Sequence, residues 1–147
     1  MLTFSATISS RSSKNTQGPP SESEILALNP QRCEMILNTT GWDKLFPGTL
    51  NLEVDEEIVH RLLLCTPLIR EDASDIRYPD GSTHIQKLRV GYLYYTGRIE
   101  RRGKKVSVLI RRACNPLKKR LEAFSQERIR DVLILSEGET VICKVDE

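Results

Sequence analysis

The chain has 147 residues, of which 39% are hydrophobic, 29% charged and 5% aromatic, a composition that excludes a disordered or membrane-spanning protein and suits one soluble domain. Its net charge is only +2, but the stretch 98–130 holds twelve Lys or Arg and three Glu, which leaves an acidic remainder. Such a basic segment indicates an anionic partner, either a nucleotide, a nucleic acid or a phosphorylated substrate. The plainer alternative is a solvated basic face.

Strict alternation of apolar and polar residues over 2–9 predicts a strand rather than a targeting helix. The polar, Pro/Gly/Ser-rich stretch 10–28 is predicted to be a mobile loop. Asn29-Pro30 then has the pattern of a helix start, with an N-cap Asn and Pro at the first position. We expect this helix to end near residues 38–41 and to turn its apolar side chains inward, namely Cys33, Ile36 and Leu37.

A Pro-Gly turn at residues 47–48 opens a second predicted strand over 49–54. Side chains on a strand alternate between its two faces, so Leu50, Leu52 and Val54 share one face. A hydroxyl, an amide oxygen and a carboxylate stand in a row on the other face. Oxygen ligands of this kind bind Mg²⁺ when the ion also holds phosphates, whereas the plainer reading is the solvated side of a half-buried strand. The row consists of Thr49, Asn51 and Glu53.

The second half of the chain predicts further short elements. Residues 56–64 form a short helix, 72–82 a second loop, and 88–94 and 106–110 the strands of a hairpin with its turn at 101–104. Ser125 is predicted to cap a helix that includes Ile129 and Leu133, and a last strand covers 140–145. The whole chain, 1–147, is therefore expected to be one mainly β domain, a small closed barrel with two or three short helices.

Four cysteines are widely scattered and lack the spacing of a metal site. Nothing in the composition indicates secretion, so we expect a reduced, cytoplasmic protein without a disulfide framework. His60 and His84 have no assignable partner and are expected to be structural. The cysteines are Cys33, Cys65, Cys114 and Cys143.

Two blocks of the sequence resemble the archaeal-type CTP-dependent riboflavin kinases. The first is Gly41 to Val54, whose Pro-Gly-Thr-Leu-Asn run is similar to a glycine-aromatic-proline stretch that ends in Gly-Thr-Leu-Asn in that family. The second runs from Glu122 to Val141 and resembles the family's C-terminal pattern of Glu, a spacer, Leu-Arg and Leu-x-x-Gly-Asp-x-Val. Order, spacing and total length agree, so the resemblance spans most of the chain.

The resemblance implies a six-stranded cradle-loop (RIFT-type) barrel that transfers a phosphoryl group from CTP to riboflavin and releases FMN and CDP. It implies that Thr49 and Asn51 bind Mg²⁺, that Glu122 contacts the flavin, and that Cys114 replaces a flavin-binding Thr. Membrane association is not expected, and nucleic acid is a less favoured partner. The nucleotide-binding residues that it implies are Ser10, Arg11, Ser12, Ser13 and Lys14, together with Glu127, Arg128, Ile129 and Arg130.

The chain departs from this family in its phosphate loop, because no glycine follows the first strand until Gly18. Close approach of the backbone to a nucleotide is harder without glycine, so the nucleotide donor stays open. The same feature favours an alternative in which a degenerate kinase binds a flavin or nucleotide as a sensor. A third interpretation follows from the C-terminal pattern, which is also similar to the swapped-hairpin barrels of bacterial DNA-binding regulators.

Overall fold

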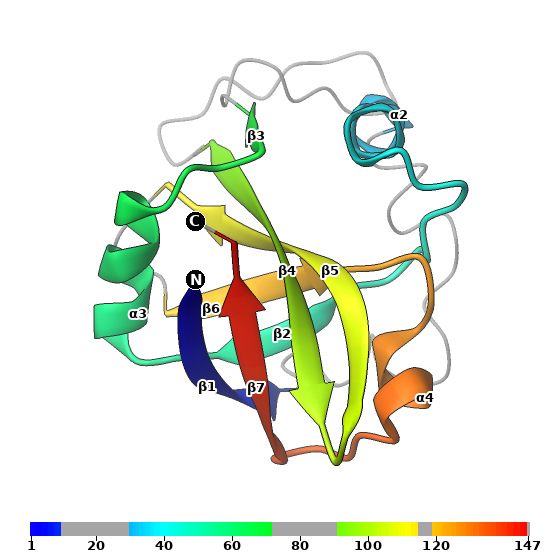
Figure 1. Cartoon of the computed structure of the whole chain (residues 1–147). Coiled ribbons are helices and arrows are strands. Elements are labelled where there is room, and N and C mark those ends of the chain that lie inside the picture. Colours follow the sequence, from blue (N-terminus) through cyan, green and yellow to red (C-terminus); the bar gives the residue numbers. More distant parts are fainter. Residues whose placement is uncertain (10–29, 72–90, 115–118, 147) are drawn as a thin grey trace.

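A computed structural model describes residues 1–9, 30–71, 91–114 and 119–146 (Figure 1). Within these ranges the chain is mainly β, with three short α-helices and one 3₁₀ turn. The elements are β1 (Leu2–Ser9), α2 (Pro30–Thr40), β2 (Leu50–Glu53), α3 (Glu56–Arg61), the 3₁₀ turn η2 (Leu62–Leu64), β3 (Ile69–Glu71), β4 (Tyr92–Arg101), β5 (Lys104–Ala113), β6 (Arg120–Phe124), α4 (Ile129–Leu133) and β7 (Thr140–Val145).

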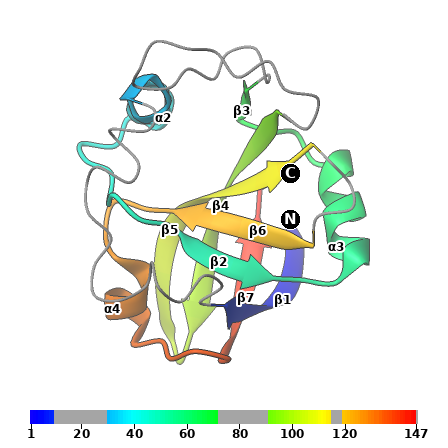
Figure 2. The same ribbon diagram turned by 180° about the vertical axis from the view of Figure 1, so that it is seen from behind.

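The strands form one antiparallel sheet in the order β3-β4-β5-β6-β2-β1-β7, and an additional pairing of β4 with β7 closes six of them into a barrel. The expected small closed barrel with two or three short helices is therefore confirmed. The seventh strand, β3, pairs with the first residues of β4, while β7 pairs with later residues of the same strand. Both chain ends lie close together, because Leu2 pairs with Val145 (Figures 1 and 2).

Closure of the barrel depends on a glycine at the point where the edge of β4 begins to pair with β7. Gly97 stands opposite Val145, and a Cβ at Gly97 would come within 2.2 Å of the carbonyl oxygen of Lys144. Non-bonded atoms cannot approach so closely, so any side chain at this position would push β7 away from β4. The absence of a side chain thus lets the two strands meet.

The barrel interior is filled by the apolar residues that alternation predicts for β1, β2 and β5. Leu50 and Leu52 belong to this interior cluster, as do Val108 and Ile110 of β5. A second, smaller cluster packs α2 against the opposite face of the barrel wall, through Ile36 of the helix. Besides Ile36, its buried members are Ile69, Tyr94, Leu109 and Phe124.

Most of the predicted elements are confirmed within the described residues. The strand predicted at 49–54 is β2, the helix predicted at 56–64 is α3 followed by η2, and the predicted turn of the hairpin is the pair Arg102-Gly103. The first strand of the hairpin, predicted at 88–94, is instead β4 at Tyr92–Arg101, because pairing with β5 and β7 continues up to the turn. The strands β3 and β6 were not predicted. Cys33 and Ile36 are buried in α2 as expected, whereas Leu37 is only half-buried. The predicted loops at 10–28 and 72–82, and His84, lie outside the described residues.

The predicted capping role of Ser125 is wrong. The helix α4 begins at Ile129 with Arg128 at its N-cap, and no side chain of the described residues caps it. Ser125 instead donates a hydrogen bond to the carbonyl of Ser107 (3.1 Å) and accepts one from the backbone N–H of Glu127 (3.4 Å). The hydroxyl is therefore used to hold the end of β6 against β5.

All four cysteines are free in the structure. None of the described helices is both long and apolar enough to span a membrane.

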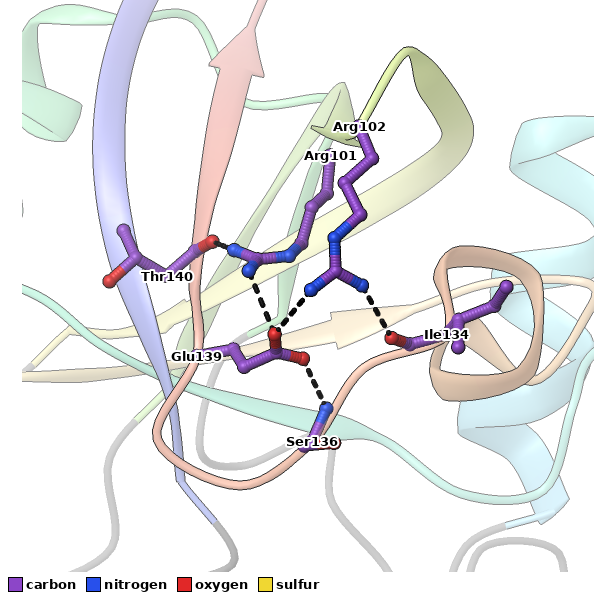
Figure 3. A network of polar contacts seen from close by, with 6 residues as sticks. All are labelled: Arg101, Arg102, Ile134, Ser136, Glu139 and Thr140. Atoms are coloured by element: carbon purple, nitrogen blue, oxygen red, sulfur yellow. Dashed lines mark hydrogen bonds and ion pairs between the residues drawn. The ribbon is translucent and has the colours of Figure 1, made fainter.

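A polar latch fastens the β4–β5 turn to the segment that leads into β7 (Figure 3). The carboxylate of Glu139 accepts hydrogen bonds from Arg101 (2.8 Å), Arg102 (2.9 Å) and the backbone N–H of Ser136 (2.6 Å). The two arginines also donate to backbone carbonyls, Arg101 to that of Thr140 and Arg102 to that of Ile134. This cluster, called here the Glu139 latch, ties together two turns that are far apart in the sequence.

Candidate functional site

A row of polar side chains crosses the outer wall of the barrel on four neighbouring strands. Asn51 of β2 stands opposite Glu122 of β6, which stands opposite Arg111 of β5, which in turn stands opposite Tyr94 of β4. Residues directly opposite in an antiparallel sheet share a face. On these four strands the residues that alternate with the row belong to the interior cluster, so the side chains of the row face outward.

Glu122 lies at the centre of this row and is held from two sides. One of its carboxylate oxygens accepts a hydrogen bond from Arg111, and the other accepts one from the hydroxyl of Thr49 (3.3 Å). Burial by itself would raise the pKa of Glu122, but the charge and hydrogen bond of Arg111 and the hydrogen bond of Thr49 outweigh it and hold the pKa below its usual value. The carboxylate is thus kept ionised while 30% of the side chain remains exposed.

Arg111 lies almost entirely inside the wall, with 9% of its side chain exposed. Its guanidinium carbon is 4.2 Å from the ring centre of Tyr92 and 5.0 Å from that of Phe124, so aromatic faces offset part of its lost hydration. Its Nε and Nη1 groups are buried and have no hydrogen-bond acceptor among the described residues. Arg111 therefore keeps hydrogen-bonding capacity that Glu122 does not use.

The row continues toward α2 through a buried glutamate. Tyr94 donates a hydrogen bond to Glu71 (2.9 Å), which also forms an ion pair with Arg32 of α2 (3.0 Å). Burial raises the pKa of the Tyr94 hydroxyl, although the nearby charges of Arg111 and Arg32 lower it in part, so the hydroxyl remains a proton donor. Sequence reasoning missed Arg32, Glu71 and Tyr94, because only the pairing of β3 with β4 and the packing of α2 on the sheet bring them together.

The structure brings the two predicted metal ligands together with the predicted flavin ligand. Thr49 directly precedes β2 and contacts Glu122, while Asn51 is 9% exposed and stands opposite Glu122 in the sheet. All three supply oxygen atoms, which suit Mg²⁺. Because Arg111 already neutralises Glu122, the oxygens best placed for the ion are those of Thr49 and Asn51. No group of three His, Cys, Asp or Glu that could hold a metal occurs in the described part of the chain.

The segment that precedes β2 contacts the segment that follows β6. Phe46 donates a backbone hydrogen bond to the carbonyl of Ser125 (2.8 Å), and Lys44 forms an ion pair with Glu127 (2.8 Å). The backbone N–H of Asp43 adds a hydrogen bond to the side chain of Gln126 at 3.3 Å. The two sequence blocks that carry the family resemblance therefore touch in space.

The remaining predicted site residues divide into three groups. Cys114 is exposed just after β5, and no described contact joins it to Glu122. Arg128 pairs with Asp131 (3.4 Å), whereas Arg130 is half-buried and the side chain of Ile129 is buried in the interior cluster, which leaves only its backbone for a ligand. The predicted nucleotide segment Ser10, Arg11, Ser12, Ser13 and Lys14 lies outside the described residues. Ser9, the last residue of β1, stands opposite Asn51, so β1 ends beside the row.

Much of the positive charge in the basic segment is matched by acids of the same chain. Arg98 pairs with Glu100 (2.6 Å), two further arginines belong to the Glu139 latch, and Arg111 pairs with Glu122. Two cations stay close to the site itself: Lys119 and Arg120 line a shallow hollow with Glu53 and Val54 at the end of the β2–β6 pair. The part of the basic segment that borders the row is thus the part suited to an anionic ligand.

No protein-family model matches the chain, and a search of curated proteins found no match. The functional argument therefore rests on the geometry of the row and on the residues that flank it.

Proposed function

We propose that this protein is a Mg²⁺-dependent phosphotransferase that converts riboflavin to FMN with a nucleoside triphosphate, CTP being the donor that the sequence resemblance favours. One observation carries the proposal: the hydroxyl of Thr49 and the amide of Asn51 lie beside the ionised carboxylate of Glu122, on neighbouring strands of one rigid wall. Phosphoryl transfer depends mainly on positioning and on neutralising charge, and such a wall supplies the positioning.

Each residue of the row has a distinct part in this proposal. Thr49 and Asn51 would hold Mg²⁺, which neutralises the phosphate oxygens when it is bound. Glu122 would accept a hydrogen bond from a hydroxyl of the flavin side chain, and Arg111 keeps Glu122 ionised for that purpose. Lys119 and Arg120 border the row and would attract the phosphates.

The direct test is to incubate the purified protein with riboflavin, MgCl₂ and each nucleoside triphosphate in turn, and to measure FMN by chromatography with fluorescence detection. Asn51→Ala removes a metal ligand from the outer face while the interior face of β2 stays intact, so FMN formation should fall about 100-fold with the fold preserved. Asn38→Ala, at an exposed position of α2, is the matched control and should retain full activity. Equal rates in the two variants would exclude the metal role of Asn51.

A flavin or nucleotide sensor is the second candidate, and the Arg111–Glu122 ion pair favours it. A carboxylate that already has a cationic partner can bind a hydroxyl without any turnover. Tight riboflavin binding without FMN formation from any nucleotide would support the sensor. The DNA-binding alternative is disfavoured by the internal pairing of Arg98, Arg101 and Arg102, and salt-sensitive binding of generic duplex DNA without flavin binding would support it instead.

A further inference from the structure

Arg112 is a charged residue inside the barrel. It follows Arg111 on β5 and therefore points to the opposite face, where it stands opposite Leu93 of the interior cluster. Only 1% of the residue is exposed. Its Nε donates a hydrogen bond to the backbone carbonyl of Val59 in α3 (2.9 Å), whereas Nη1 and Nη2 are buried and have no acceptor in the part of the chain that the structure describes.

A second unused donor lies on the neighbouring strand. Tyr95 is two residues from Leu93 on β4, so it shares the interior face with Arg112. The residue is fully buried, and its hydroxyl has no hydrogen-bond partner within residues 1–9, 30–71, 91–114 and 119–146. Burial raises the pKa of Tyr95, with Arg112 and Arg70 acting in the opposite direction, so the hydroxyl remains a proton donor near positive charge.

A guanidinium buried without a counter-charge is strongly unfavourable, and no described residue supplies a carboxylate to Arg112. The hydrogen bond from Nε to Val59 fixes the plane of the group, so its two terminal nitrogens form a fork that matches a pair of oxygen atoms. Tyr95 adds a third donor on the same face.

We propose that Arg112 and Tyr95 bind a small oxyanion, a phosphate or a carboxylate, inside the barrel beneath α3. This site lies on the opposite face of β5 from Arg111 and does not depend on the proposed function. The anion supplies the missing counter-charge and ties β4, β5 and α3 together through the Val59 contact.

The test compares thermal unfolding of the whole protein in sodium phosphate, sodium acetate and sodium chloride at equal ionic strength. A ligand that binds only the folded state raises Tm with the logarithm of its concentration. We expect phosphate or acetate to raise Tm above the chloride value, and whichever acts identifies the phosphate or the carboxylate source. Dissociation constants follow from the same titrations and from calorimetry with inorganic phosphate or acetate alone.

Variants decide whether the effect belongs to this site. Arg112→Met keeps much of the side-chain volume but removes charged donors, so it should weaken oxyanion binding about 10- to 100-fold. Tyr95→Phe removes one neutral donor and should weaken binding by about 3- to 10-fold. Arg98→Met removes a surface arginine of β4 and should leave the response unchanged. Each variant is referred to its own Tm in chloride, so a general loss of stability does not obscure the result.

Two outcomes would overturn the proposal. One is an equal response of the wild type to all three salts. The other is an oxyanion response that persists undiminished in Arg112→Met.

Discussion

Two glutamates of this barrel are each held by arginine, with opposite consequences. In the Glu139 latch, one carboxylate joins two arginines and a backbone N–H, and the same arginines reach backbone carbonyls of the adjoining turns (Figure 3). Glu122 has one arginine and one threonine, and Arg111 keeps two buried donors unused. The carboxylate of the latch accepts hydrogen bonds from three donors, and one buried donor, the Nε of Arg101, has no acceptor among the described residues. In the row, two such donors of Arg111 remain, beside a carboxylate with only two donors, so the row retains more capacity for a ligand.

The two pairs also differ in their surroundings. Arg102 of the latch is 57% exposed, so water and salt screen its charge, whereas Arg111 is 9% exposed and lies against two aromatic rings. Coulomb interactions are stronger where water is excluded. We therefore expect changes at Arg111 and Glu122 to have large effects that salt barely alters, and changes in the latch to have small effects that salt removes.

The largest expected effect is that of Arg111→Met, which leaves Glu122 as a partly buried charge without its partner. Loss of one partner from a fully buried pair costs about 3–5 kcal/mol, and because Glu122 is 30% exposed we expect a loss of about 2–4 kcal/mol in the free energy of unfolding. Urea denaturation measures it. The double variant Arg111→Met with Glu122→Leu should recover much of the loss. A double variant as unstable as Arg111→Met alone would show that the charge pair is not the cause.

Glu122→Gln is expected to act on function. The amide keeps the shape but removes the charge that, under the proposed function, would accept the hydrogen bond of a flavin hydroxyl, so riboflavin affinity and turnover should fall about 10- to 100-fold. Calorimetry with riboflavin and the FMN assay measure the two quantities separately. Glu139→Gln is the matched control in the latch and should change neither. Wild-type affinity and turnover in Glu122→Gln would remove Glu122 from the site.

The pH dependence of stability should distinguish the same two carboxylates. The pKa of Glu122 is lowered in the folded state, so the folded protein binds its proton less readily than the unfolded chain does. Its stabilisation is therefore fully present above the ordinary glutamate pKa of about 4.3 and is lost as the pH falls through the lower, folded value. Urea titrations between pH 7 and pH 3 should show a shallower decline in Glu122→Gln than in the wild type. The pKa of Glu139 is also lowered, by the Ser136 N–H and the two arginines, but Arg102 is 57% exposed, so water and salt screen its charge and the corresponding change in Glu139→Gln should be smaller.

The smallest expected effect is the response of the latch to salt. Screening acts over about 10 Å at 0.1 M salt and about 3 Å at 1 M, so the destabilisation caused by Arg102→Met should shrink as NaCl rises toward 1 M. The destabilisation caused by Arg111→Met should stay nearly constant over the same range. Thermal unfolding of both variants and the wild type in a NaCl series tests this difference. A parallel decline of both destabilisations with rising NaCl would contradict the expected difference between the two arginines.

Much of the fold follows from local pattern. Alternation in β1 and β2, the Pro-Gly turn before β2 and the hairpin turn at Arg102-Gly103 are short-range features whose consequences depend little on the rest of the chain. Ser125 shows the limit of such reasoning. Its position favours an N-cap, but β6 runs on to Phe124 and the carbonyl of Ser107 on β5 takes the hydroxyl, so a tertiary contact overrides the local preference.

The sequence predicted only part of the candidate site. The neighbours Arg111 and Arg112 look alike there, as two members of a basic run. Strand alternation sends one to the outer wall beside Glu122 and the other into the barrel beneath α3, but which of the two goes inward depends on register. The Thr49–Asn51 row was predictable because both residues lie on one short stretch. The cation that accompanies this row, Arg111, was not predictable as its partner, because it comes from another strand.

The amino-acid sequence by itself determined the alternating strands β1, β2, β5 and β7, the turns before β2 and β5, and the oxygen-bearing face of β2, because side-chain direction within a strand is a local property with a period of two. The tertiary structure alone decided that Glu122 stands between Asn51 and Arg111, and that Gly97 lies where β4 meets β7. These relations join residues up to about seventy positions apart. They arise only when the barrel closes, since register between distant strands is selected by burial of the whole apolar face rather than by any neighbouring residue.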